Sequence, residues 1–335
     1  MAETVNISKM AELLSKEIFS VFGWQAKGLK NYSWPCVLPE QHHKKRIKKL
    51  HPTDVVFHYF DPYTNQTTYV IIDLKSYSKG SLQSVDLSSA LRSLGHTVEC
   101  AKLSKDWQDQ YLDPSENAQV VGMLFIFNHD NQLDRDFMEL LEVATPGKIS
   151  IPKNQRVFVL SPERIVILNS IAKDILALRG SNDLPSAGEC TLVFPDLVRH
   201  KSFDPRPKAA TIEQLLAPWI LLEYRWKTSG LKPAGKIVYW MDAASDVDDF
   251  KYLFDFLFRY QLVNDDSALR VRCLNPDPKA FAGFEVAKEQ YAKDYWPLTG
   301  SSTRQSQKRM STITFEAVTS VVECFSQQQV GFRDV

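Results

Sequence analysis

The chain has 335 residues, with 40 basic and 40 acidic side chains, so its formal net charge at pH 7 is zero. Hydrophobic residues make up 44% and aromatic residues 11% of the sequence, which is ample for packed cores, and the length favours two domains. The balanced charge argues against a protein that coats nucleic acid broadly, and no apolar stretch approaches the roughly 18 residues that a membrane helix needs.

The first predicted element is a helix that ends near residue 22. Its apolar residues follow a helical repeat, which comprises Met10, Leu13, Leu14, Ile18, Val21 and Phe22. Glu17 falls inside this stripe, so we expect its carboxylate to point toward the interior of the domain. The alternative is a Glu at the margin of the stripe whose stem reaches water.

A basic run follows at residues 42–49, with the sequence His-His-Lys-Lys-Arg-Ile-Lys-Lys. Its cations could neutralise several phosphates and guide nucleic acid, and they are Lys44, Lys45, Arg46, Lys48 and Lys49. A solvated surface run or a targeting signal would have the same composition. His42 and His43 do not suggest a metal pair, because adjacent side chains diverge.

Residues 54–60 and 68–75 read as two strands joined by a turn at 62–65. If the hairpin folds about Tyr63 and Thr64, Asp54 lies opposite Asp73. Side chains alternate across a strand, so Asp73 and Lys75 share one face. Asp61 lies at the far end of the hairpin, where we expect it to start the turn.

This hairpin predicts a divalent metal site. Two carboxylates beside a backbone carbonyl form an all-oxygen site suited to Mg2+, or to Mn2+ in its place. A metal there could polarise a phosphoryl oxygen, while Lys75 orients a water molecule or stabilises developing charge. The alternative is an ordinary solvated ion pair of Asp73 and Lys75 on an edge strand.

A polar loop at residues 76–81 follows, then a helix with one apolar face and a continuous apolar strand at 120–127. The helix face comprises Leu87, Leu91, Leu94, Val98 and Ala101. Lys79 and Gln83 lie just beyond the hairpin, where they could contact phosphate; the alternative is that each is a solvated surface residue.

Asp54, a hairpin, and Asp73-x-Lys75 at the end of an apolar strand resemble the PD-(D/E)XK nuclease superfamily. The resemblance covers roughly the first 130 to 165 residues and implies a restriction-endonuclease-like α/β fold, a mixed sheet flanked by helices. It also implies that Asp54, Asp73 and the Leu74 carbonyl bind the metal and that Lys75 is catalytic. Glu17 would be the additional acid that the first helix often supplies in this superfamily. That core needs an earlier strand, which residues 34–38 fit poorly.

The second half predicts a smaller α/β domain. A strand at 155–160 and a helix from 161 to about 180 close the first domain, residues 1–180, and a linker at 181–188 precedes a second domain at 189–335. There, strands at 190–194, 236–240 and 269–273 alternate with helices at 211–226 and 246–260. Asp246, Asp248 and Asp249 occur where acids favour a helix N-terminus.

The five cysteines are scattered and form no Cys-x-x-Cys pair, which indicates reduced thiols rather than disulfides or zinc, and hence a cytoplasmic protein. Together with the resemblance, these features predict a metal-dependent endonuclease acting on nucleic acid, DNA in preference to RNA. By analogy with stand-alone nucleases of the resembled superfamily, the expected setting is bacterial restriction or antiviral defence. Two alternatives stay open. One is a non-catalytic binding module, and the other is a subunit active only with a protein partner that supplies ATP hydrolysis or target recognition.

Overall fold

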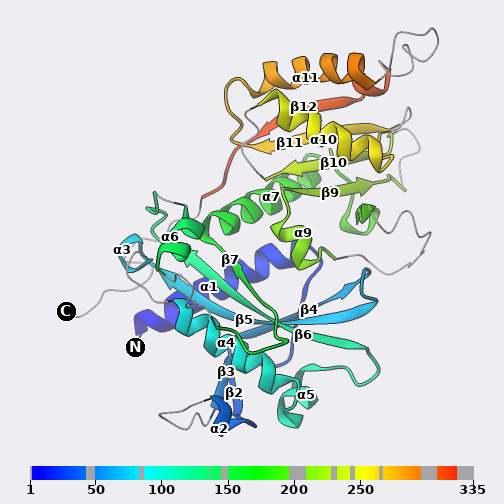
Figure 1. The fold of residues 1–335 in the computed structure, drawn as a ribbon. Helices are drawn as coiled ribbons and strands as arrows, with labels where there is room; N and C mark the ends of the chain where they lie inside the picture. Colours follow the sequence, from blue (N-terminus) through cyan, green and yellow to red (C-terminus); the bar gives the residue numbers. More distant parts are fainter. Residues whose placement is uncertain are drawn as a thin grey trace. The chain divides into compact units, whose positions relative to one another are not determined.

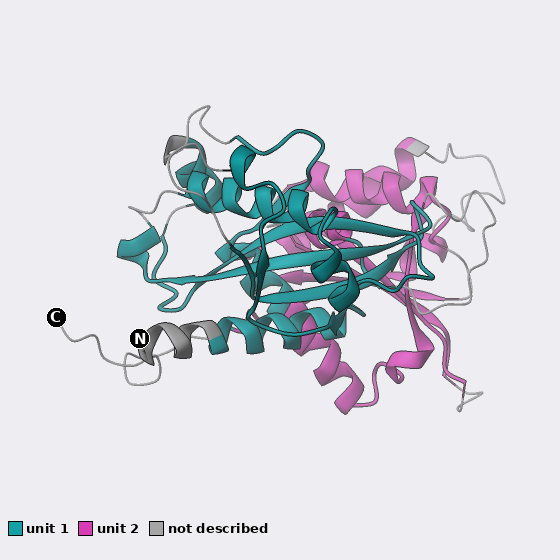
Figure 2. Ribbon diagram, turned by 90° about the horizontal axis from the view of Figure 1, so that it is seen from below, with its two compact units in different colours: residues 1–169, 209–211, 322–335 teal, residues 170–208, 212–321 magenta. Residues whose placement is uncertain are grey.

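The computed structural model describes residues 2–42, 50–82, 87–134, 136–144, 150–195, 209–227, 232–241, 246–263, 267–295 and 308–322. These residues form two compact units (Figure 2). The first consists of residues up to 169 together with 209–211, and the second lies between residues 170 and 321. None of the helices in the described part of the chain combines the length and apolar character that crossing a bilayer requires.

The first unit is built around a mixed sheet of five strands in the order β1-β4-β5-β6-β7 (Figure 1). The strands are β1 (Gln25–Lys27), β4 (Val55–Asp61), β5 (Gln66–Tyr77), β6 (Ala118–Asn128) and β7 (Val157–Leu160). β1, β4 and β5 pair antiparallel, and β5, β6 and β7 pair parallel. A separate two-stranded sheet joins β2 (Tyr32–Pro35) to β3 (Leu50–Thr53). The predicted restriction-endonuclease-like mixed sheet is confirmed.

Helices cover both faces of this sheet (Figure 1). α1 (Ala2–Val21) packs on one face, where Phe19 contacts the rings of Phe57 and Phe125. α4 (Leu87–Ala101) packs on the other face, with its predicted apolar stripe buried. The remaining helices of this unit are α2 (Pro39–His42), α3 (Lys79–Leu82), α5 (Lys105–Tyr111) and α6 (Phe137–Ala144).

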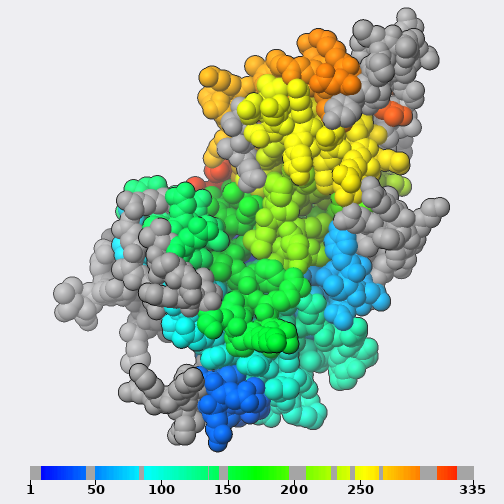
Figure 3. Space-filling view, in the orientation of Figure 1, coloured from blue at the N-terminus to red at the C-terminus, as the bar shows by residue number. Residues whose placement is uncertain are grey.

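The second unit has its own five-stranded sheet, in the order β12-β11-β10-β9-β8. Its strands are β8 (Cys190–Leu192), β9 (Trp219–Tyr224), β10 (Gly235–Trp240), β11 (Ala268–Leu274) and β12 (Ile313–Val318). α10 (Val247–Arg259) and α11 (Ala280–Tyr295) cover one face and form the outer surface of this unit in the space-filling view (Figure 3). The predicted second α/β domain is thus confirmed.

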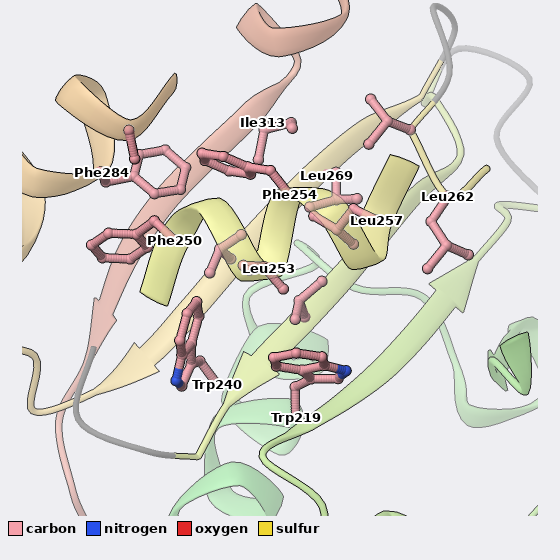
Figure 4. Close-up of a cluster of buried hydrophobic side chains, with 14 of the residues drawn as sticks. Trp219, Trp240, Phe250, Leu253, Phe254, Leu257, Leu262, Leu269, Phe284 and Ile313 are labelled. Carbon is pink, nitrogen blue, oxygen red and sulfur yellow. The ribbon is translucent and has the colours of Figure 1, made fainter. Parts of the chain in front are cut away.

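The core of the second unit is aromatic (Figure 4). Phe250 of α10 lies 5.4 Å from the ring of Trp240 in β10 and 5.3 Å from that of Phe284 in α11. At the start of α10, the Asp249 carboxylate accepts the backbone N–H of Asp246, so these acids cap the helix as predicted. The short elements η1 (Ala187–Glu189) and α9 (Ile212–Leu216) complete the unit.

The helix predicted at 211–226 is wrong. α9 ends at Leu216, and the apolar residues after Pro218 form β9, which pairs antiparallel with β10. Proline disfavours a helical conformation for the preceding residue, and a continuous apolar run fits a strand buried on both faces as well as it fits a helix.

The boundary between the two units falls inside α7 (Pro162–Gly180) rather than at the predicted linker 181–188. The second half of this helix belongs to the second unit, where Asp174 accepts hydrogen bonds from Tyr239 of β10 and Arg272 of β11. A buried ion pair of this kind gives no signal in the sequence, because its two residues are far apart along the chain.

The two sheets share one pairing order. In each unit, three consecutive strands of the sheet pair antiparallel and the last two are added in parallel. In the second unit β8, β9 and β10 pair antiparallel, and β10, β11 and β12 pair parallel. The sequence carries no sign of this repeat, because the two halves share a topology and not a residue pattern.

Candidate active site

The β4–β5 hairpin has the register that the sequence predicts. Val55 pairs with Ile72 and Asp61 with Gln66, so Asp54 and Asp73 are the next residues at the open end. The Asp61 carboxylate accepts the backbone N–H groups of Tyr63 and Thr64 and thereby fixes the turn, as expected. The turn therefore sets which residues meet at the far end of the hairpin.

Asp54, Asp73 and Lys75 meet at that end. The Asp54 carboxylate accepts the Leu74 backbone N–H at 2.8 Å, and the Lys75 ammonium lies 2.5 Å from the Asp73 carboxylate. The side chains of Asp73 and Lys75 remain 24% and 33% exposed. The group is therefore partly buried, yet open to a ligand from solvent.

These three residues line a cavity of about 370 Å³. Its wall on the opposite side comes from α4, which contributes Ser89, Ser93 and Thr97. These residues are four apart and so share one face of the helix. These three residues were not predicted, because they are not part of the apolar stripe by which the sequence indicates α4. A stripe of small hydroxyl residues at spacing four, beside a strand that ends in charged residues, is the signal that could have identified them.

The electrostatics of the site favour a cation. Burial raises the pKa of Asp54, and the nearby Asp73 carboxylate raises it further, whereas the Leu74 N–H and the Lys75 ammonium act in the opposite direction. Burial alone would lower the pKa of Lys75, but the negative charges of Asp73 and Asp54 outweigh it and raise the pKa. Two adjacent carboxylates repel each other unless a positive charge lies between them.

The other predicted site residues lie elsewhere. Glu17 is exposed and does not line the cavity, and its helix packs on the sheet face opposite α4. The buried stripe of α1 runs through Ala11 and Ser15, while Leu13 is 59% exposed, so the expected inward position of Glu17 is wrong. Because these small residues are buried and Leu13 is not, the buried face of α1 differs from the face that the hydrophobic residues of the sequence indicate.

Of the residues predicted to contact nucleic acid, Lys79 is the one that lies among the described residues. The Lys79 ammonium lies 2.8 Å from Asp134 and does not line the cavity. Gln83 and the basic run lie outside the described residues, and that run comprises Lys44, Lys45, Arg46, Lys48 and Lys49. The backbone N–H of Leu74 donates to Asp54 and its side chain is 9% exposed, while the role of its carbonyl as a metal ligand stays a prediction.

The second unit has different residues at the corresponding positions. β9 begins at Trp219, which pairs with Trp240 of β10, just as Val55 of β4 pairs with Ile72 of β5. The next residues outward are Pro218 and Met241, and the Met241 N–H donates to the Pro218 carbonyl. An apolar pair therefore stands where the first unit has two acids.

Comparison with known proteins agrees with this geometry. Residues 1–164 match the family model described as the GAPS4 protein PD-(D/E)XK nuclease domain. No curated protein and no solved structure gives a significant match. The matched segment contains the whole hairpin and α4, and it ends close to Asn169, where the first continuous stretch of the first unit ends. Residues 1–164 of this chain are therefore a PD-(D/E)XK nuclease domain, similar to that of the GAPS4 protein.

Proposed function

We propose that the first unit hydrolyses phosphodiester bonds of nucleic acid with the help of Mg2+ or Mn2+. The observation that carries this proposal is the meeting of Asp54, Asp73 and Lys75 in one open cavity within the matched nuclease domain. DNA in preference to RNA is the proposed substrate, and bacterial restriction or antiviral defence is the proposed setting, by analogy with stand-alone nucleases of this superfamily.

The residues present fit a hard divalent cation. Asp54 and Asp73 supply adjacent carboxylates, and the carbonyl of Leu74 is a further proposed ligand. When bound, the ion would polarise a phosphoryl oxygen and make a water molecule more acidic. Glu17 is not among the proposed ligands, because it is exposed on the helix that covers the opposite sheet face.

Lys75 supplies the positive charge of the chain itself. Its ammonium is anchored by Asp73 and faces the cavity, where it would stabilise the negative charge that develops on the phosphoryl oxygens. The raised pKa keeps this group protonated at neutral pH. Lys75 would therefore stabilise the developing charge or orient the attacking water.

The test is cleavage of labelled DNA and RNA by the purified full chain, with Mg2+, with Mn2+ and with EDTA. We expect metal-dependent cleavage by the wild type and a loss on the order of 100-fold or more in Asp73→Asn and Lys75→Met. Matched controls are Asp109→Asn and Lys105→Met on α5, whose side chains are 63% and 83% exposed and which should leave the rate unchanged.

Two outcomes would contradict the proposal. One is full activity in both cavity variants. The other is a wild-type chain that cleaves no substrate with either metal, even when its fold is intact by circular dichroism. Cleavage that begins only after a second protein is added would support the alternative of a subunit that works in a complex.

A further inference from the structure

A second group of side chains that could hold a metal ion lies where the β2–β3 sheet meets the last turns of α4. It consists of Cys36 after β2, His42 at the end of α2, His51 in β3 and Cys100 in α4. One ligand atom from each residue lies within 4.8 Å of all the others. His42, His51 and Cys100 are buried, and Cys36 is partly buried.

The three distances among Cys36, His42 and Cys100 match those around a tetrahedral ion. The two sulfurs are 3.7 Å apart, and His42 Nδ1 lies 3.4 Å from Cys36 Sγ and 3.6 Å from Cys100 Sγ. Zinc bonds of about 2.3 Å to sulfur and about 2.0 Å to nitrogen in a tetrahedron require about 3.8 Å between sulfurs and about 3.5 Å between sulfur and nitrogen. A disulfide would need an S–S distance of about 2.05 Å.

His42 is oriented as a zinc ligand would be. Its Nδ1 faces the two sulfurs, while its other ring nitrogen, Nε2, lies 2.9 Å from the Glu99 carboxylate. A carboxylate that accepts the second N–H of a ligating histidine fixes the tautomer and leaves the first nitrogen's lone pair for the metal. Glu99 is adjacent to Cys100 on α4, so one helix supplies both a ligand and the residue that orients another ligand.

The tautomer of His51 follows from its partner. Thr97 Oγ1 donates its proton to the Ser93 carbonyl at 3.0 Å, so it accepts from His51 Nδ1, which lies 3.1 Å away. Because Nδ1 carries the proton, Nε2 carries the lone pair and is the nitrogen that would bind the ion. Both histidines are therefore held in the state that a metal requires.

We propose that Cys36, His42, His51 and Cys100 bind one Zn2+ ion as a structural site. Two sulfurs and two imidazole nitrogens are soft to intermediate ligands, which select zinc over the hard cations that the carboxylates of the cavity prefer. Four protein ligands complete the tetrahedron and leave no position for substrate, so the ion stabilises the fold and takes no part in hydrolysis. This site is distinct from the cavity and does not depend on the proposed nuclease activity.

The sequence gives no signal for this site. The cysteines are separated by more than 60 residues, and the ligand spacing matches no zinc-finger pattern, so the sequence analysis argued against zinc. The fold gathers the ligands because the β2–β3 sheet packs beside the last turns of α4. His51 also lies three residues before Asp54, and its partner Thr97 lines the cavity, so the ion would hold one wall of the cavity in place.

The metal content of the purified full chain tests the proposal. We expect about one zinc ion per chain by inductively coupled plasma mass spectrometry after dialysis against metal-free buffer. Exchange with Co2+ should give the visible absorption of a tetrahedral ion together with thiolate-to-metal charge transfer. Zinc well below one equivalent, stoichiometric iron in its place, or a Cys36–Cys100 disulfide by mass spectrometry would each overturn it.

Single cysteine variants locate the ion. Cys36→Ser and Cys100→Ser should each lower the zinc content about tenfold, whereas Cys190→Ser, at a cysteine of the second unit, should leave it unchanged. Wild-type zinc content in both cluster variants would overturn the assignment of ligands. If these variants do not fold, the Co2+ spectrum of the wild type still decides the question, since it reports thiolate ligands directly.

Glu99 provides a finer test. Glu99→Gln removes the carboxylate that orients His42 but leaves all four ligands in place, so we expect about 10-fold to 100-fold weaker zinc binding, measured by competition with a chromophoric chelator. Glu139→Gln on the exposed side of α6 is the matched control and should bind zinc like the wild type. Equal affinity in both variants would show that Glu99 has no positioning role.

Discussion

At the scale of single residues, the candidate active site places the carboxylate of Asp54 beside that of Asp73, which disfavours its ionised form. Asp54 is partly buried and lies beside another carboxyl group, and both effects raise its pKa. The folded protein therefore holds an acid whose ionised form is destabilising until a cation binds. A site of this kind lowers the free energy of unfolding of the protein when no ligand is bound.

Replacement of Asp54 should make this visible. Because the pKa is raised in the folded state, the stabilising contribution of the protonated acid is complete below the ordinary value of 3.8 and is lost as the pH rises through the folded value. Ionised Asp54 is thus destabilising at neutral pH. In EDTA, we expect Asp54→Asn to have a higher Tm than the wild type at pH 7, with the difference disappearing below about pH 4. Thermal unfolding across a pH series measures this.

Asp109→Asn, a change on exposed α5, should show no such pH-dependent difference in Tm. A lower Tm for Asp54→Asn than for the wild type at pH 7 would contradict the argument. It would mean that the bond from the Leu74 N–H, which an amide oxygen accepts less strongly, outweighs burial and the charge of Asp73.

The site residues on the hairpin were predictable for a simple reason. Once Tyr63 and Thr64 are taken as the centre of the turn, the register pairs Asp54 with Asp73, and alternation adds Lys75. Glu17 was not predictable in this way, because buried Ala11 and Ser15 carry too little hydrophobic signal to show where the stripe of α1 lies. The Cys2His2 cluster was not predictable either, since its ligands meet only in three dimensions.

At the scale of elements, the cavity depends on the close approach of α4 to β6. Gly122 of β6 lies beneath the helix, where an added Cβ would be 2.9 Å from Leu94 Cγ and 3.0 Å from Val98 Cγ2. Residues of α4 line the cavity on the same side of the sheet. The distance between helix and sheet therefore sets the width of the cavity.

Gly122→Ala should push α4 away from the sheet. We expect a loss of about 1–3 kcal/mol in the free energy of unfolding by chemical denaturation, together with reduced cleavage, because overpacking displaces the helix that lines the cavity. Gly180→Ala at the end of α7 is the control, since nothing lies within 4 Å of its added Cβ, and it should be neutral or slightly stabilising. Unchanged stability in Gly122→Ala would contradict this packing.

The second sheet is fixed to α7 by a buried ionic network. Arg272 forms bonds to both Asp174 and Glu316, and the Tyr239 hydroxyl also donates to Asp174. The side chains of Arg272 and Asp174 are only 10% and 12% exposed. Removing one partner from such a network leaves a buried charge uncompensated.

We therefore expect Asp174→Ala to lower the free energy of unfolding by about 3–5 kcal/mol in urea or guanidinium titrations. Arg225→Ala is a control, because its partner Glu223 forms an ion pair with it at the surface, where Arg225 is 78% exposed, and the change should stay below about 1 kcal/mol. Similar small losses for both variants would show that the network is not important for stability.

The elements that the sequence missed share a physical cause. β1, the edge strand Gln25–Lys27, has exposed polar residues and so shows no alternation of apolar and polar side chains. β9 was predicted as part of a helix because its apolar residues are continuous and do not alternate with polar ones, so the pattern does not distinguish a strand from a helix. Elements with a strong period, such as α4 and the β4–β5 hairpin, were located closely.

At the scale of the whole molecule, the net charge of zero means that attraction to nucleic acid must come from a local region. The basic run just before β3 is the strongest candidate in the sequence, and it leads within a few residues to Asp54. Its cations would release counterions from each phosphate that they contact.

Replacing the five cations of the run by Gln should therefore change the salt dependence of binding. We expect the slope of log affinity against log salt concentration to fall by about 0.9 for each DNA phosphate that the variant no longer neutralises. Fluorescence anisotropy with the inactive Asp73→Asn background measures this without cleavage. Lys105→Gln, at an exposed cation of α5, should leave the slope unchanged. An unaltered slope in the five-fold variant would exclude the run from binding.

The shared pairing order of the two sheets has a consequence for the products of the reaction. The second unit carries Pro218 and Met241 where the first carries Asp54 and Asp73, so these two positions offer acids once per chain. Under the proposed hydrolysis, one such centre would break one backbone at a time. A closed circular duplex treated with a single copy of the chain should then accumulate as the nicked form before any linear molecule appears, unless two copies act together on opposite strands.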